Sequence, residues 1–256
     1  MKRLGLIGYP LSHSFSKKYF TQKIDNQHLI HEWKYDLYPI ENIEKLPELL
    51  RGCQNELVGL NVTIPYKELV IPYLDDIDEQ AALIKAVNCI KITWNDDKKP
   101  HLKGYNTDAT GFEMSLRTFL NGHILENLQA LILGTGGAAK AVIYTCNKLN
   151  IPYICISRTA SKGTLTYDDL TEHIMKTHRL IINTTPLGMS PHTEGCPLLP
   201  FQYIDNQHFI YDLIYNPSKT RLMEQAEARG AKTQNGLDML YKQAEEAWII
   251  WNKNDA

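Results

Sequence analysis

Short apolar runs alternate with amphipathic stretches along the whole chain, and this pattern predicts an α/β protein. In the first part it predicts strands at 4–8, 35–37 and 57–62, and helices at 16–26 and 41–51. Residues 67–85 indicate one or two helices, and 87–94 with 102–105 flank a polar turn as a hairpin would. Gly52 is expected just past the helix at 41–51. Strands that alternate with helices favour a largely parallel sheet.

A second series of the same kind begins near Leu128. It predicts strands at 130–133, 153–156, 180–183 and 209–213, and helices from a glycine-rich turn to about 149, at 168–176 and at 218–229. We expect Ser218 to cap the last of these helices and Gly230 to end it. Two series predict two domains, at 1–108 and 109–236.

The C-terminal segment, 237–256, predicts a long amphipathic helix that packs back on the first domain. At about 100° per residue its apolar side chains form one stripe. The stripe consists of Leu237, Leu240, Tyr241, Ala244, Ala247, Trp248 and Trp251. Gln243 falls at its edge, where an amide either faces a cleft or is solvated.

Composition narrows the classes of partner. The formal net charge of -2 gives no electrostatic basis for binding nucleic acid or an anionic membrane. No apolar run approaches the roughly 20 residues of a membrane span, and residues 1–8 do not resemble a signal peptide. The five cysteines lack a CxxC spacing, which argues against a disulfide framework or a zinc site. We expect a cytoplasmic monomer or homodimer that binds a small molecule and no metal.

The sequence Gly134-x-Gly136-x-x-Ala139 follows a predicted strand and opens a predicted helix. Gly134 permits the tight turn, Gly136 lets a pyrophosphate approach the backbone, and Ala139 allows close packing of helix on strand. The N–H groups of the helix start can then hold phosphates. A merely tight turn is the alternative, but strand, spacing and helix together favour dinucleotide binding.

The end of the next strand distinguishes NADP from NAD. An acid here would bond the ribose 2′-hydroxyl of NAD, but the chain has Ser157-Arg158-Thr159 and then Lys162. Arg158 can pair with a 2′-phosphate through its planar guanidinium, and Lys162 adds charge. Both could instead be ordinary surface residues; the location favours NADP.

Further motifs occur in a fixed order along the chain. They are Ser12-His13-Ser14-Phe15-Ser16, Asn61-Val62-Thr63-Ile64-Pro65-Tyr66-Lys67, Ala86-Val87-Asn88, Gly104-Tyr105-Asn106-Thr107-Asp108, Asn183 to Met189, Asp212 to Pro217 and Gly236 to Leu240 with Gln243. This series resembles the shikimate dehydrogenase family over nearly the whole chain. The family fold that this implies has a substrate domain and a Rossmann-type NADP domain.

The resemblance implies roles for individual residues. Lys67 matches the catalytic lysine, with Asp108 as its partner. The positions that match substrate contacts are Ser14, Ser16, Thr63, Asn88, Asp108, Tyr215 and Gln243. The positions that match cofactor contacts are Glu79, Gly134, Thr135, Gly136, Gly137, Ala138, Ser157, Arg158, Thr159, Lys162, Leu213 and Gly236. The reaction implied is the reduction of 3-dehydroshikimate by NADPH.

The residue types suit this chemistry. Ser, Thr, Asn and Gln can bond the hydroxyls of a polyhydroxylated ring, and Ser14 and Ser16 can hold its carboxylate. Hydride transfer to a ketone builds negative charge on oxygen, so a proton donor such as Lys67 lowers the barrier. Asp108 would favour the ammonium form of that lysine or bond a substrate hydroxyl.

Each residue also has an ordinary explanation. Lys67 could be a solvated lysine, Asp108 a helix N-cap, and Asn61 a structural residue that holds the Lys67 loop. His13 lies in a matching motif, but we assign it no catalytic role. Because these residues occur together at the spacing of the family motifs, we favour catalytic and binding roles over the ordinary ones. A quinate/shikimate dehydrogenase of broader specificity and a non-catalytic NADP-binding sensor are the alternatives.

The chain departs from the family pattern at three places. Lys17-Lys18-Tyr19-Phe20 replaces a stretch that often contains Pro and His-Asn, which puts the opening of the first helix in question. Cys89 stands where Thr is frequent, and Ser157 replaces the Asn that usually begins the NADP motif. Ser157 still donates and accepts a hydrogen bond, so we expect the cofactor preference to survive.

Overall fold

The structure, a computed structural model, describes residues 1–11, 14–121, 128–159 and 163–253. They form two compact units, one of Met1–Thr107 with Ala244–Ala256 and one of Asp108–Gln243. The α/β class expected from the sequence is confirmed, with one six-stranded sheet in each unit. The last helix is divided between the units at Gln243, whereas all of 237–256 was expected to pack on the first domain.

The sheet of the first unit has the order β2-β1-β3-β5-β6-β4. Its strands are β1 (Lys2–Gly8), β2 (Trp33–Pro39), β3 (Leu57–Val62), β4 (Asp76–Ile77), β5 (Cys89–Trp94) and β6 (Pro100–Tyr105). β1 is parallel to β2 and β3, while β5 runs antiparallel to β3 and β6. The predicted hairpin is therefore confirmed as β5–β6.

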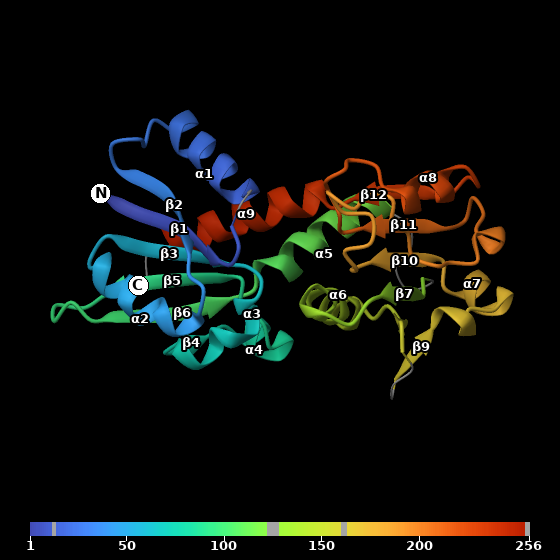
Figure 1. Cartoon of the computed structure of the whole chain (residues 1–256), viewed down its shortest axis with the longest axis horizontal. Helices are drawn as coiled ribbons and strands as arrows, with labels where there is room; N and C mark the ends of the chain where they lie inside the picture. Colours follow the sequence, from blue (N-terminus) through green and yellow to red (C-terminus); the bar gives the residue numbers. More distant parts are fainter. Residues whose placement is uncertain (12–13, 122–127, 160–162, 254–256) are drawn as a thin grey trace. The chain divides into compact units, whose positions relative to one another are not determined.

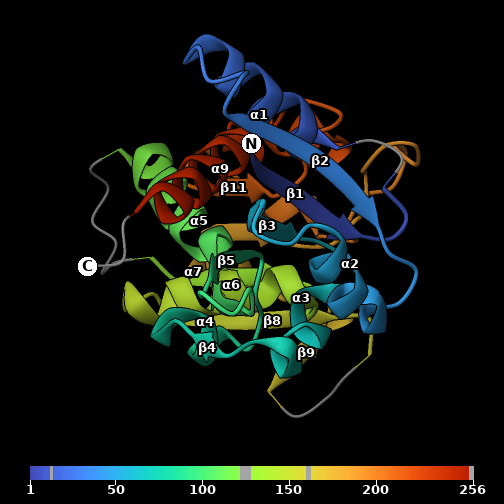
Figure 2. The same ribbon diagram turned by 90° about the vertical axis from the view of Figure 1, so that its left-hand side faces the viewer.

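Helices cover both faces of this sheet (Figures 1 and 2). They are α1 (Phe15–Asn26), α2 (Leu46–Gly52), α3 (Tyr66–Leu69) and α4 (Glu79–Ile84). Phe20 and Ile24 of α1 pack with Leu4 on one face. Leu46 of α2 packs with Ile7 on the other. Side chains alternate across a strand, so β1 contributes to both cores.

The sheet of the second unit is parallel throughout, with the order β12-β11-β10-β7-β8-β9. Its strands are β7 (Ala130–Leu133), β8 (Tyr153–Ser157), β9 (Thr164–Thr166), β10 (Leu180–Asn183), β11 (Phe209–Asp212) and β12 (Lys232–Asn235). β8 and β9 follow β7 outward on one side of the sheet, and β10, β11 and β12 then follow outward on the other side of β7. This order is that of a Rossmann-type sheet, which binds ligands where the direction reverses, between β7 and β10.

The helices of the second unit also lie on both faces of the sheet. They are α5 (Thr107–Leu120), α6 (Gly137–Lys148), α7 (Glu172–Thr177), α8 (Arg221–Glu227) and the part of α9 (Leu237–Asn252) up to Gln243. Phe112 of α5 and Val142 of α6 pack on one face, and Met175 of α7 and Leu222 of α8 on the other. No helix among the described ranges is long and apolar enough to cross a membrane.

Several predicted helix ends were wrong. The helix at 41–51 is a 3-10 turn, Ile43–Lys45, followed by α2, because Pro47 begins a new helix more easily than it continues one. Gly52 is the last residue of α2, and Cys53 caps it. Thr220, not Ser218, caps α8: its hydroxyl accepts from the N–H of Met223 at 3.4 Å.

Three other details differ from the predictions. The region 168–176 splits into a 3-10 turn, Tyr167–Asp169, and α7. The stripe on α9 is buried only in its C-terminal half, since Leu237 and Tyr241 are exposed. Asp108 is not an N-cap, because α5 already begins at Thr107.

Candidate active site

In the first unit, the loops after β1 and β3 meet at one edge of the sheet. The two strands are adjacent and parallel, with Ile7 beside Val62. The Thr63 N–H donates to the Ile7 carbonyl at 3.0 Å, and the Tyr9 N–H donates to Ile64 at 3.2 Å. A side chain on Gly8 would collide with that of Thr63. Glycine at position 8 therefore lets Thr63 lie against the loop that leads to Ser14.

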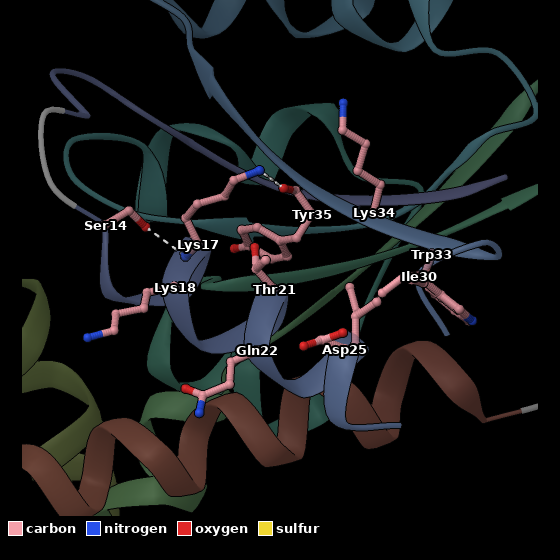
Figure 3. Close-up of a pocket in the computed structure, with 11 residues that line it drawn as sticks. Ser14, Lys17, Lys18, Thr21, Gln22, Asp25, Ile30, Trp33, Lys34 and Tyr35 are labelled. Carbon is pink, nitrogen blue, oxygen red and sulfur yellow. Dashed lines mark hydrogen bonds between the residues drawn. The ribbon is translucent and has the colours of Figure 1, made fainter. Parts of the chain in front are cut away.

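Ser14 caps α1 from this loop. Its hydroxyl oxygen accepts a hydrogen bond from the Lys17 N–H at 3.2 Å (Figure 3). Lys17 also donates through Nζ to the carbonyl of Tyr35 and pairs with Asp36 at 3.3 Å. The departure at Lys17 thus leaves the helix opening intact and ties α1 to β2. Ser16 lies in the first turn of α1, and His13 lies outside the described residues.

Figure 3 shows Ser14 at one end of a groove of about 770 Å³ between α1 and β2. Most of its lining is remote from the predicted substrate contacts. Among them only Ser14 borders this groove within the described part of the chain. The size of a cavity therefore does not identify the candidate site in this unit.

Backbone bonds bring Lys67 and Asn88 to the same edge as Thr63. The Val62 N–H donates to the Asn88 carbonyl at 2.8 Å, and the Val87 N–H donates to the Lys67 carbonyl at 2.7 Å. The Asn88 side chain is buried and accepts from the Thr107 N–H at 2.7 Å. These bonds hold three segments, at 62–67, 87–88 and 107, together at this edge of the sheet.

Two buried hydrogen bonds of Asn61 link the segments next to this edge. The Tyr35 hydroxyl donates to Asn61 Oδ1 at 2.7 Å, and Asn61 Nδ2 donates to the Asn88 carbonyl at 3.5 Å. Burial raises the pKa of Tyr35, and a hydrogen bond with Ser16 opposes that rise. A structural role in holding the Lys67 loop was one alternative for Asn61; these two bonds connect β2 with the residue before β5.

The second unit carries Asp108, Tyr215 and Gln243. Asp108 lies in the first turn of α5, and Gly111 follows on the same face three residues later. A Cβ on Gly111 would lie 2.8 Å from the Gln243 nitrogen, so α5 and α9 pack backbone to backbone here. Gln243 is buried and donates to the Leu240 carbonyl at 2.9 Å. Tyr215 is 39% exposed in the loop after β11.

A cavity of about 430 Å³ in the second unit lies at the carboxyl ends of β7, β8 and β10. Five of the predicted cofactor residues line it, namely Gly134, Thr135, Gly136, Ser157 and Arg158. Gly134 has a φ of +103°, which favours glycine. Space beside Gly136 is open to 4 Å, so a phosphate can approach its backbone.

A second wall of this cavity, which adjoins the glycine turn, was not predicted. It is formed by Thr184, Thr185, Pro186 and Leu187, with Tyr167 near β9. Burial raises the pKa of Tyr167, and the positive charge of Arg158 opposes the rise. The lining residues that the structure describes include no acid, and this favours a 2′-phosphate over a free 2′-hydroxyl.

The remaining predicted cofactor residues lie outside this lining. Gly137 and Ala138 begin α6, and Thr159 is exposed after β8. Leu213 follows β11, and its carbonyl lies so close to Gly236 that any side chain there would collide with it. Lys162 lies outside the described residues. Glu79 is exposed at the first position of α4 and belongs to the first unit.

Similarity to known proteins covers almost the whole chain. A family model described as the shikimate dehydrogenase substrate binding domain matches residues 6–90. Shikimate dehydrogenase (NADP(+)) of Caldicellulosiruptor saccharolyticus is 35% identical, over 98% of this chain and 92% of that protein. The corresponding protein of Methanothermobacter thermautotrophicus is 36% identical, over 98% and 91%.

A solved structure agrees with these sequences. The crystal structure of shikimate 5-dehydrogenase from Thermus thermophilus, in complex with NADP(H) and shikimate, is 29% identical. It matches with a TM-score of 0.82, over 98% of this chain and 94% of the other. Sequence and fold therefore agree, and the chain belongs to the shikimate dehydrogenase family.

Proposed function

We propose that this protein catalyses the reversible NADPH-dependent reduction of 3-dehydroshikimate to shikimate, a step of chorismate and aromatic amino-acid biosynthesis. The observation that carries the proposal is the presence of Lys67 and Asp108 in their motifs in a chain of this family, together with a cavity beside Arg158 whose described lining includes no acid. The first unit is proposed to bind the substrate and the second to bind NADP, in the cytoplasm.

The substrate contacts follow from the donor and acceptor types at the two sets of loops. The hydroxyls of Ser14 and Ser16 are proposed to hold the carboxylate, and Thr63 and Asn88 to bond the ring hydroxyls. The second unit adds Asp108, Tyr215 and Gln243. The bond from Val87 to the Lys67 carbonyl supports this arrangement, because it fixes the lysine backbone beside Asn88.

Bound NADPH supplies the hydride in this reaction. The backbone of 134–138 is proposed to hold its pyrophosphate, with the N–H groups of the first turn of α6. Arg158 and Lys162 are proposed to pair with the 2′-phosphate, with Ser157 and Thr159 beside them. Glu79 is assigned to the nicotinamide end, and Leu213 and Gly236 to further contacts with the cofactor.

Lys67 is proposed to donate a proton from Nζ to the ketone oxygen as negative charge develops there. Asp108 is assigned to favouring the ammonium form of Lys67 or to bonding a substrate hydroxyl. Replacing Lys67 by Ala should lower kcat by about 10²–10⁴-fold, the contribution typical of general acids. NADP affinity should change little, since the cavity residues come from the second unit.

The first measurement is absorbance at 340 nm with shikimate or quinate, each with NADP and with NAD. Fast NADP reduction with shikimate supports the proposal, and Lys18→Ala, an exposed lysine of α1, is the control for Lys67→Ala. Strong NAD-linked oxidation of quinate would indicate the enzyme of broader specificity. NADP binding without any turnover would indicate the sensor, and normal turnover by Lys67→Ala would remove the lysine from the mechanism.

Arg158→Ala tests the cofactor preference separately. A charge-assisted bond to phosphate contributes about 1.5–3 kcal/mol. We therefore expect Kd for NADP to rise roughly 10–100-fold, while Kd for NAD stays within about threefold. Isothermal titration with both cofactors measures the two values. Equal weakening of both would show that Arg158 has no role at the 2′-phosphate.

A further inference from the structure

Asp212, at the end of β11, is a completely buried carboxylate. Three neutral donors contact it: Asn183 Nδ2 at 2.9 Å, the Ile214 N–H at 3.1 Å and the Thr220 hydroxyl at 2.6 Å. Burial raises its pKa, and the three hydrogen bonds oppose the rise. A buried carboxylate that only accepts hydrogen bonds must select the orientation of its donors.

β10 lies beside β11 in the sheet (Figure 1), and Asn183 of β10 is the register partner of Asp212. An amide has one donating and one accepting end, so the donating end of Asn183 must face the carboxylate. The accepting end then points to the turn after β10. Asn183 Oδ1 accepts from the Thr185 N–H at 3.0 Å and from the Thr185 hydroxyl at 2.7 Å.

The turn held in this way forms the wall of the cofactor cavity at 184–187. The Leu187 N–H donates to the Thr185 hydroxyl oxygen at 3.3 Å, so the same chain of bonds continues along the wall. Thr185 and Leu187 are only partly covered by protein, and local bonds are what fix their backbone. The chain of bonds therefore runs from Asp212 through Asn183 to the surface that a dinucleotide would contact.

We propose that Asp212 is a positioning residue for NADP, which sets the orientation of the Asn183 amide and thereby the cavity wall at 184–187. The inference rests on the proposed function, because it assumes that this cavity takes the cofactor. Asp212 does not touch the cofactor; its effect is transmitted through Asn183 and Thr185. The hydrogen bond from the Thr220 hydroxyl to Asp212 is separate from this chain of bonds, because Thr220 caps α8.

Four variants separate positioning from general stability. Asp212→Ala and Asn183→Ala should each raise Kd for NADP about tenfold, because Thr185 loses the oriented amide that holds it, although Thr184 stays bonded to the Leu133 carbonyl. They should leave kcat at saturating cofactor within about threefold. Asp212→Asn should retain most affinity, since one amide oxygen can accept from Asn183 and Ile214 while Thr220 reverses its hydroxyl. Thr220→Val is the control: it breaks the third bond and the cap but leaves the bonds of Asn183.

The readouts are Kd for NADP by titration, the melting temperature, and KM against kcat. The double variant Asp212→Ala/Asn183→Ala should bind NADP no more weakly than the worse single variant, because both break one chain. Additive losses, or a Kd for Thr220→Val raised as much as for Asp212→Ala, would overturn the proposal. If Asp212→Ala does not fold, unchanged NADP affinity in Asn183→Ala overturns it alone. Failure of the unaltered protein to bind NADP would instead refute the proposed function.

Discussion

The three glycines after β7 have different surroundings although they are close in sequence. Gly134 has a positive φ, and a Cβ there would lie 2.8 Å from Thr184 Oγ1. At Gly136 and Gly137 a Cβ would have no atom within 4 Å. Conformation therefore requires glycine at 134, whereas at 136 only an approaching ligand would exclude a side chain.

We therefore expect Gly134→Ala to destabilise the protein by about 1–3 kcal/mol, the cost of a strained backbone conformation. Gly136→Ala should unfold at the same urea concentration as the parent but bind NADP much more weakly. Gly137→Ala is the control for stability. Urea unfolding and NADP titration measure the two effects. A Gly136→Ala variant that binds normally would show that the pyrophosphate does not approach this turn.

At the scale of elements, the C-terminal half of α9 is fixed by a tight contact in the first unit. Trp251 Nε1 donates to the Ile90 carbonyl at 3.0 Å, and its ring lies directly over Gly59 of β3. A methyl group on Gly59 would collide with that ring. The absence of a side chain at Gly59 is what allows the Trp251 ring, and with it the helix, to approach the sheet.

Gly59→Ala should accordingly lower the free energy of unfolding by about 1–3 kcal/mol, as overpacking of a core does. Gly52→Ala is the matched control, because Gly52 lies in α2 with open space around it. That change should be neutral or stabilising by up to about 1 kcal/mol. Urea unfolding distinguishes the two. Equal stability of both variants would show that the Trp251 ring can move aside without cost.

How far the elements could be predicted depends on whether their signal is local. The strands β3, β7 and β10 were placed correctly because they are short, continuous apolar runs. The edge strands β4, β9 and β12 were missed, since few of their residues are buried and their pairing is non-local. Helix α5 was suggested only through Asp108 as a possible N-cap and was given no bounds, although its buried residues Phe112, Leu116 and Leu120 recur at helical spacing.

The candidate site, too, could be predicted from the sequence only in part. Motifs gave the residues proposed to touch substrate or cofactor, such as Lys67 and Arg158. The supporting bonds could not be predicted, because the orientation of the Asn183 amide is set by Asp212, 29 positions later, across a strand pair. Spacing along the chain contains no information on which end of an amide faces which neighbour.

At the scale of the whole molecule, several carboxyl groups with lowered pKa values determine how stability depends on pH. Glu113 of α5 is one of them. Burial acts to raise its pKa, but hydrogen bonds from Lys148 of α6 at 2.7 Å and from Arg117 at 3.0 Å outweigh burial. A lowered pKa means that the folded state holds this proton less tightly than the unfolded chain. Glu113 therefore contributes stability above its unfolded pKa, and this is lost as pH falls through its folded pKa.

Glu113→Gln should lower the free energy of unfolding at pH 7 by about 0.5–1.5 kcal/mol, a modest value for a partly exposed ion pair. The difference from the parent should shrink between about pH 5 and pH 3, because the parent also loses the charge there. Asp212 acts in the opposite sense: its pKa is raised by burial, so its protonation favours the folded state in acid. Urea unfolding at four or five pH values measures the difference, with Glu48→Gln, an exposed carboxyl of α2, as control. A loss for Glu113→Gln as large at pH 3 as at pH 7 would mean that packing, not charge, joins α5 to α6.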